Sequence, residues 1–157
     1  MKKGFILVTQ WTFRATAREF WDVTVDVIAY PEWWPYIHNV AIRGKESRLQ
    51  QDSLIDYEIK GFLPHSLRFH THVTLCEPFS RIEMIASGDL EGTGISILDE
   101  SNGVTRATFI WNVALTPPIL DRLNQWKLFH SLFVWNHDFT MRSAVKNMWS
   151  HTMSRSN

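Results

Sequence analysis

The sequence predicts an α+β domain in which a curved, seven-stranded antiparallel sheet wraps around a long C-terminal helix, with two short helices after the first strand. Three observations support this fold class. Seven segments are rich in β-branched and aromatic residues, and the last six of them are separated by short turn signals, which favours antiparallel neighbours. Two short segments after the first strand lose the alternation and take helical periodicity. The stretch 119–150 contains no Gly or Pro and repeats apolar residues at helical spacing, so it predicts one long helix.

The elements can be placed in order along the chain. The first strand is predicted over 5–14. Thr16 followed by Glu19 is a capping-box pattern that starts a helix over 17–25, and a second helical stretch over 27–36 contains Pro31 and Pro35. Gly88 to Gly92 reads as a tight bend whose two acids face solvent. The remaining strands are predicted at about 39–47, 53–60, 66–77, 80–88, 93–99 and 104–114.

Alternation along the strands assigns an inward and an outward face. On the strand 66–77, for example, Leu75 joins the inward set while His70 and His72 face outward. Because a strongly curved sheet cannot pack flush along a straight helix, we expect an apolar cavity between the two. The side chains predicted on the concave side are Ile55, Tyr57, Phe69, Val73, Phe109 and Trp111.

Length and composition restrict the class of protein. The 157 residues suit one domain over 1–157, and the formal net charge of zero argues against nucleic acid as a partner. The low net charge also favours self-association, so a homodimer is a possible assembly. Cys76 is the single cysteine, which excludes an intramolecular disulfide and suits a reducing compartment, the cytoplasm. No segment approaches the ~20 apolar residues of a spanning helix, so we expect no membrane insertion.

Aromatic residues are unusually abundant, with eight Trp and ten Phe. Rings of this size line ligand cavities and interfaces as well as ordinary cores. Trp33 and Trp34 stand between two prolines, where they could form the rim of a cavity or plug the core. Neighbouring residues on a helical turn cannot both face the same way, which leaves both interpretations open. Trp111 on the last strand is the leading candidate to line the cavity, with ordinary core packing as the alternative.

Two histidine patterns could carry chemistry. His137 shares a helical stripe with His130 and with apolar side chains, including Phe133 and Met141, and a polar group there could orient a ligand or act as a general acid or base. A buried structural histidine is the alternative. His70 and His72 could form half of a metal site, but no carboxylate on their strand completes it. No nucleotide, dinucleotide or zinc motif is present, so no metal and no cofactor are predicted.

Four stretches, in this order, resemble the START-like, or SRPBCC, superfamily, in the group of polyketide cyclases, dehydrases and lipid transport proteins. The resemblance spans nearly the whole chain and implies a helix-grip fold with a hydrophobic cavity. Members bind lipids, hormones or aromatic polyketides, and only some are enzymes. The stretches are Phe20-Trp21-Asp22-Val23 with Tyr30-Pro31-Glu32-Trp33-Trp34-Pro35, Gly61-Phe62-Leu63-Pro64, Gly88-Asp89-Leu90-Glu91-Gly92-Thr93-Gly94 and Phe133-Val134-Trp135-Asn136-His137-Asp138.

Three hypotheses about function follow. The first is a domain that binds or carries a small hydrophobic ligand, lipid-like or resembling an aromatic polyketide. The second is a polyketide cyclase or dehydratase with His137 as acid or base and Tyr57 orienting a carbonyl. The third is an interaction module whose cavity is filled by side chains. The predicted ligand-binding residues are Trp34, Tyr57, Phe69, Phe109, Trp111, Phe133, His137 and Met141.

Overall fold

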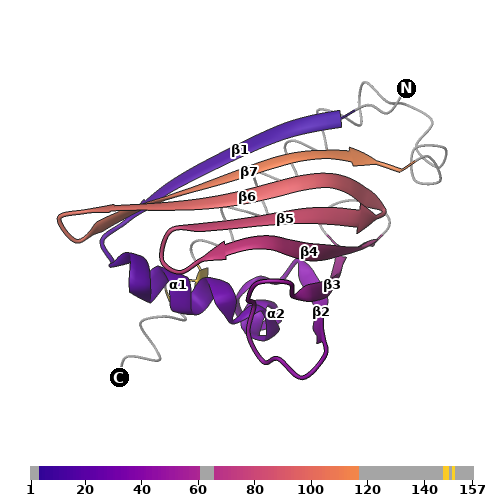
Figure 1. The fold of residues 1–157 in the computed structure, drawn as a ribbon, viewed down its shortest axis with the longest axis horizontal. Helices are drawn as coiled ribbons and strands as arrows, with labels where there is room; N and C mark the ends of the chain where they lie inside the picture. The colour runs from indigo at the N-terminus through magenta and orange to yellow at the C-terminus, as the bar shows by residue number, and fades with distance from the viewer. Residues whose placement is uncertain (1–3, 61–65, 117–146, 149, 151–157) are drawn as a thin grey trace.

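The computed structural model describes residues 4–60, 66–116, 147, 148 and 150, with the backbone alone for Phe5. A strand is followed by three short helical segments and then by six further strands (Figure 1). The elements are β1 (Gly4–Phe13), α1 (Ala17–Val25), the 3₁₀ turn η1 (Val27–Ala29), α2 (Tyr30–Trp33), β2 (Ile37–Arg43), β3 (Leu54–Ile59), β4 (Leu67–Glu77), β5 (Arg81–Gly88), β6 (Leu90–Ser101) and β7 (Val104–Leu115).

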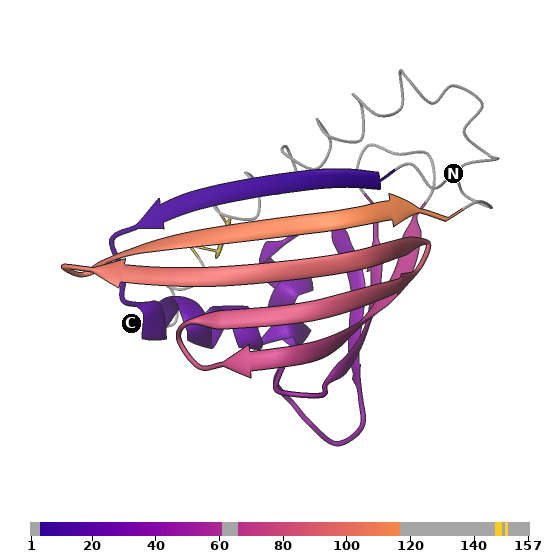
Figure 2. The same ribbon diagram turned by 45° about the horizontal axis from the view of Figure 1, so that its top comes forward.

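The strands form one antiparallel sheet in the order β1-β7-β6-β5-β4-β3-β2, which confirms the predicted seven-stranded α+β architecture. Consecutive strands from β2 to β7 are neighbours, as their short connections require. β1 pairs with β7 along its whole length, from Gly4 opposite Ala114 to Phe13 opposite Thr105. The sheet is strongly curved, so that β2 and β3 run steeply across the direction of β1 and β7 (Figure 2).

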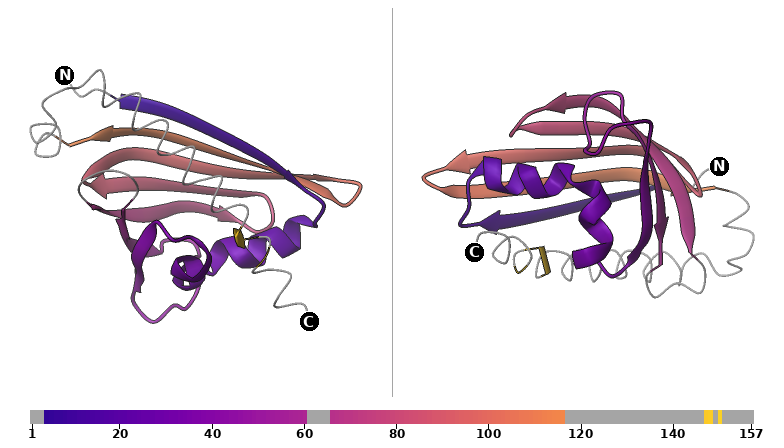
Figure 3. Two further views of the ribbon diagram at one scale, coloured as in Figure 1. Left: turned by 180° about the vertical axis from the view of Figure 1, so that it is seen from behind. Right: turned by 90° about the horizontal axis from the view of Figure 1, so that it is seen from below.

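α1 is fixed to the sheet by polar contacts at its start. The predicted capping box is present: the Thr16 side chain accepts from the Glu19 backbone N–H, and the Glu19 carboxylate accepts from the Thr16 backbone N–H at 2.8 Å. The Glu100 carboxylate on β6 accepts from the Ala17 backbone N–H at 2.7 Å, where it also complements the helix dipole. Both α1 and α2 lie on the same side of the sheet (Figure 3).

The second helical stretch differs from its prediction. Helix was expected over 27–36 with a break at the prolines, but α2 ends at Trp33. Pro31 lies in the first turn of α2, where its missing N–H costs nothing, so it starts this helix rather than breaking it. Trp34 is the C-cap and has non-helical backbone angles, φ −116° and ψ 88°.

A β-bulge in β4 corrects one predicted face. The register with β5 shifts between Val73 and Leu75, so that Leu75 lies opposite Glu83 and Cys76 lies opposite Ile82. The extra residue reverses the alternation beyond this point. Leu75, predicted inward, therefore points outward, and the half-buried Cys76 packs against the core.

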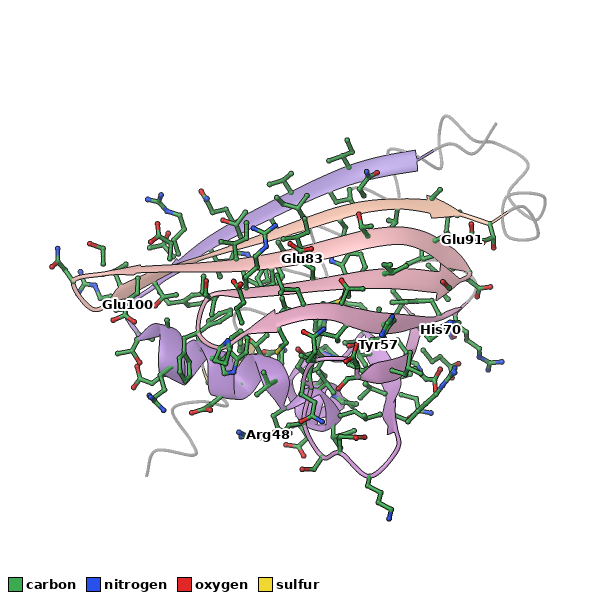
Figure 4. The ribbon with its side chains drawn as sticks, viewed as in Figure 1. Arg48, Tyr57, His70, Glu83, Glu91 and Glu100 are labelled. Atoms are coloured by element: carbon green, nitrogen blue, oxygen red, sulfur yellow. The ribbon has the colours of Figure 1, made fainter. Side chains whose placement is uncertain are left out.

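The bend at 88–92 is tighter than predicted. Asp89 alone lies between β5, which ends at Gly88, and β6, which begins at Leu90. Asp89 is not the solvated turn acid that was expected, because it is half-buried and its carboxylate accepts from the Arg68 backbone N–H at 2.8 Å. Glu91, in β6, is half-buried as well. Figure 4 shows Glu91 and Glu100 at opposite ends of β6.

The hydrophobic core lies between the concave face of the sheet and the short helices. Ile55, Val73 and Ile82 are almost fully buried there, together with Val27 from η1. Met148 is helical and 6% exposed, and it belongs to the same core cluster. The rest of the predicted helix 119–150, apart from residues 147 and 150, lies outside the described residues. No helix in the described part of the chain is long and apolar enough to cross a membrane.

Candidate functional site

The inward face of the sheet is sealed at its ends and accessible in its middle. Along β7, the inward side chains of Thr105, Ala107 and Leu115 have no exposed surface, whereas Phe109 and Trp111 between them are half-buried. In a sealed core the middle of a strand is buried at least as well as its ends. The two rings therefore border an accessible space on the concave side.

The neighbouring strands also carry half-buried inward side chains, although on β3 these continue to the strand end at Ile59. On β3, Ile55 is fully buried while Tyr57 is half-buried, and on β4 Phe69 is half-buried next to the fully buried Thr71. Met84 on β5 is half-buried as well. Four of the predicted ligand-binding residues, Tyr57, Phe69, Phe109 and Trp111, are thus brought to one face, as their alternation predicts.

Aromatic contacts connect these residues across the sheet. Tyr57 and Phe69 are cross-strand partners, and their rings stack at 5.3 Å with an angle of 19°. Phe69 on β4 also meets Trp111 on β7 edge-on, with 6.5 Å between the ring centroids. Gly94 makes room for this contact, because a Cβ there would lie 3.1 Å from Trp111 Cζ3 and 3.1 Å from Met84 Cγ. The glycine lets the indole lie across the floor of the site.

A second aromatic group covers the end of the sheet near α1. Trp11 packs against Phe109 at 5.0 Å between ring centroids, and Phe13 packs against Phe20 of α1 at 5.1 Å. Phe20 and Phe109 lie 6.5 Å apart, which joins the helix to β7. Phe109 therefore connects the packed end of the core with the accessible middle.

Trp33 and Trp34 were expected to point in different directions, and this expectation is wrong. Their rings stack at 5.8 Å with an angle of 19°. The physical reason is that Trp34 has left the helix, so the ~100° rotation between successive helical residues does not apply to it. Tyr30 contacts both rings, at 5.0 Å and 6.0 Å. The three form an aromatic group, Tyr30-Trp33-Trp34, on the α2 side of the site.

Two tyrosine hydroxyls in the site stay protonated. Burial raises the pKa of Tyr57 well above its ordinary range, and the neighbouring Thr71 side chain offsets this rise only in part. Burial also raises the pKa of Tyr30, with smaller contributions from Tyr57 and Asp26. Tyr30 donates its proton to the Thr24 backbone carbonyl. Figure 4 shows Tyr57 on the same side of β4 as α2.

Several buried polar atoms on the inward side have no hydrogen-bond partner. Within residues 4–60 and 66–116, four such side-chain atoms have no hydrogen-bond partner: Thr9 Oγ1, Trp33 Nε1, Trp34 Nε1 and Thr71 Oγ1. Thr9 lies opposite Phe109 in the β1–β7 register, and Thr71 lies opposite Ile55. Buried polar groups are normally hydrogen-bonded, so the two adjacent indoles, Trp33 and Trp34, need an explanation.

The middle of the concave surface carries no charged side chain from the described strands. On the inward face of the described strands, the charged residue is Glu100, at the far end of β6, and its carboxylate is bound to the Ala17 backbone N–H. Arg43 and Asp56 form a bidentate pair on the outer face, at 2.8 Å and 2.6 Å. The hydrogen bond from Arg43 lowers the pKa of Asp56. The accessible middle of the site is therefore lined by uncharged side chains.

The two strand histidines lie on the outer face, as the alternation predicts. His70 is half-buried opposite Asp56, and His72 Nε2 lies 3.5 Å from Asp52 Oδ1. No group of three or more His, Cys, Asp or Glu side chains in the described part of the chain is arranged to hold a metal ion.

Three of the predicted ligand-binding residues, Phe133, His137 and Met141, lie outside the described residues, and their roles stay predictions. Sequence reasoning did not name Tyr30 or Thr9 as site residues. A signal for Tyr30 was available, since it begins the Tyr30-Pro31-Glu32-Trp33-Trp34 stretch. Thr9 shares its face with Trp11 by simple alternation.

The chain was compared with protein families, with curated proteins and with solved structures. No family model matches the chain, and neither does any curated protein. Among solved structures, TTHA0849 from Thermus thermophilus has a TM-score of 0.76 at 14% identity, covering 98% of this chain and 100% of that one. The Zhui aromatase/cyclase from Streptomyces sp. R1128 has a TM-score of 0.74 at 12% identity, covering 99% and 97%. A START superfamily protein from Mycobacterium smegmatis has a TM-score of 0.59 at 17% identity, covering 85% and 95%.

The fold is the START-like helix-grip fold. At these identities the likeness establishes the architecture alone, so the ligand and any reaction have to be argued from the residues of this chain. The START-like sheet places the half-buried aromatic side chains on its concave face, where the short helices also pack.

Proposed function

We propose that this START-like domain binds or carries a small hydrophobic molecule, aromatic or lipid-like, on the concave face of its sheet. One observation carries the proposal: Tyr57, Phe69, Phe109 and Trp111 keep accessible surface on the concave face, and on β4 and β7 buried inward side chains lie on both sides of them. The same fold in a START superfamily protein and in an aromatase/cyclase supports a ligand of this kind.

The energetics favour a ligand with rings. Covering apolar surface contributes about 25 cal/mol per Å², and aromatic pairs add about 0.5–1.5 kcal/mol beyond the area they bury. The Tyr57–Phe69 stack and the edge of Trp111 offer two ring orientations on one wall. A planar molecule with several rings can contact the Tyr57–Phe69 stack and the edge of Trp111 at the same time.

The test is ligand-dependent thermal stabilisation. Fatty acids, sterols and flavonoid-like aromatics are screened, because a ligand that binds only the folded state contributes about 2.7 kcal/mol at about 100-fold excess over its Kd. For a domain of this size the melting temperature then rises by about 5–10 °C.

A blocked site and a matched control decide where the ligand binds. Gly94→Leu forces a side chain against Trp111 and Met84 and should remove the shift. Gly4→Leu makes the same substitution at an exposed glycine, where an added Cβ would lie 3.6 Å from its nearest neighbour, Val113 O, and it should keep the shift. A panel without any shift, or a Gly94→Leu protein that responds like the parent, contradicts the proposal.

A cyclase or dehydratase activity is the second candidate, with His137 as acid or base. The observation that favours it is the buried hydroxyl of Tyr57, whose raised pKa keeps it protonated and able to donate to a carbonyl oxygen. If a polyketide-like compound is turned over, Tyr57→Phe should lower kcat by at least about tenfold while ligand binding persists. An unchanged kcat would exclude Tyr57 from the reaction.

A further inference from the structure

We propose that the stacked indoles of Trp33 and Trp34 form a hydrogen-bond donor subsite, which binds the carbonyl oxygen of an uncharged aromatic ketone. This inference rests on the proposed function, because it names the chemistry of the ligand for the same concave face. It adds that the α2 end of the site selects for an oxygen acceptor on the ligand.

The first support is the state of the two N–H groups. Both Nε1 atoms are buried, and neither has a hydrogen-bond partner among the residues that the structure describes. An indole N–H is a donor only, so nothing but an acceptor satisfies it. Burying a donor without a partner is unfavourable, and here it happens on two adjacent residues. A ligand oxygen in the plane of either ring, in line with its N–H bond, would supply the missing acceptor.

The second support is the position of the indoles. Tyr30 contacts both rings, and its hydroxyl is close enough to Tyr57 for the two groups to influence each other electrostatically. Tyr57 stacks on Phe69, which meets Trp111. The aromatic group on the α2 side and the Tyr57-Phe69-Trp111 group on the sheet thus pack into the same core. Tyr30 cannot replace the indoles as a free donor, because its proton goes to Thr24 O.

The third support is charge. The inward face of the described strands carries no charged side chain near Tyr57, Phe69 or Trp111, since Glu100 lies at the far end of β6. Burying an unpaired carboxylate is far more costly than burying a carbonyl group, which one or two N–H donors can satisfy. This wall therefore fits a ketone better than a fatty acid anion.

The experiment uses a matched pair of probes, 9-fluorenone and fluorene, which share the same planar skeleton and differ in the carbonyl group. Affinities are measured by isothermal titration calorimetry on the full chain and on the variants Trp33→Phe and Trp34→Phe. Trp21→Phe is the control, because Trp21, on α1, is also a buried indole but packs against Phe79. We expect each test variant to lose about fivefold in fluorenone affinity, the value of one hydrogen bond, and the control to lose none.

A second replacement separates the N–H from the ring. Incorporating 3-benzothienylalanine at position 33 or 34 keeps the size and stacking of the ring system but removes the donor. The ligand-free protein should then melt at the same temperature or higher, because an unsatisfied group is gone, while fluorenone affinity falls and fluorene affinity does not change.

The outcomes distinguish this inference from the proposed function. If the parent binds fluorenone and fluorene equally well and the indole replacements change neither affinity, the donor subsite is wrong while ligand binding stands. If the replacements weaken both probes equally, the indoles act as packing surfaces and the inference fails as well. If the parent binds neither these probes nor any member of the wider panel, the proposed function itself fails.

Discussion

Gly92 tests how far the stability of the β6–β7 pairing depends on glycine. Its φ is +148°, and a Cβ at this position would lie 2.0 Å from the Asn112 backbone oxygen on β7. Gly92→Ala must therefore shift the end of β6 away from β7, where Leu90 pairs with Leu115. Backbone strain at such a φ costs about 1–3 kcal/mol, and each ladder hydrogen bond lost costs about 1 kcal/mol. We expect a total loss of at least about 3 kcal/mol in the free energy of unfolding.

The measurement is denaturant unfolding together with thermal melting, where this loss corresponds to about 6–12 °C. Gly103→Ala is the matched control: its φ is +72°, but no atom lies within 4 Å of the added Cβ. It should cost only the conformational strain, about 1–2 kcal/mol. The reasoning is refuted if Gly92→Ala is no more destabilising than Gly103→Ala.

Two further predictions concern the dependence of stability on pH. The hydrogen bond from Arg43 lowers the pKa of Asp56, so this pair stabilises the fold above the unfolded pKa of about 3.9 and loses its effect as pH falls through the folded pKa. Asp56→Asn should therefore flatten the acid limb of stability measured from about pH 5 to about pH 2, by a small amount that about 1 M salt abolishes because the pair is exposed. Burial raises the pKa of Tyr57, so its contribution is complete below about pH 10 and is lost as pH rises toward the folded pKa. Tyr57→Phe should make stability fall less steeply between about pH 9 and about pH 11, and a parallel decline in both proteins would contradict the burial of this hydroxyl.

The alternation of apolar residues was sufficient to predict the sheet and most of its inward face. Ile55, Tyr57, Phe69 and Trp111 were assigned correctly because a strand turns every second side chain to the same side, whatever its partners are. The capping box at Thr16 was also predictable, since both of its hydrogen bonds lie within one helical turn of the chain.

Features that depend on distant partners were not predictable. The bulge that turns Leu75 outward is set by the register between β4 and β5, and no local composition marks it. The stacking of Trp33 on Trp34 depends on the residue at which α2 ends, which periodicity locates only to within a few positions. Asp89 was assigned to solvent because its partner, the Arg68 backbone, lies on another strand.

The pairing of β1 with β7 has a consequence for the order in which this chain folds. Every other strand pairs with a neighbour in sequence, but the partner of β1 lies on the order of 100 residues further along. At about 5–20 residues per second, the ribosome takes roughly 5–20 s to synthesise the chain between the two strands. The ten residues of β1 include no charged side chain, and Ile6 and Val8 stay exposed even in the finished sheet. Until β7 is made, β1 is an apolar extended segment free to pair with strands of other nascent chains, so crowding on a polysome is the condition under which this fold is most exposed to aggregation.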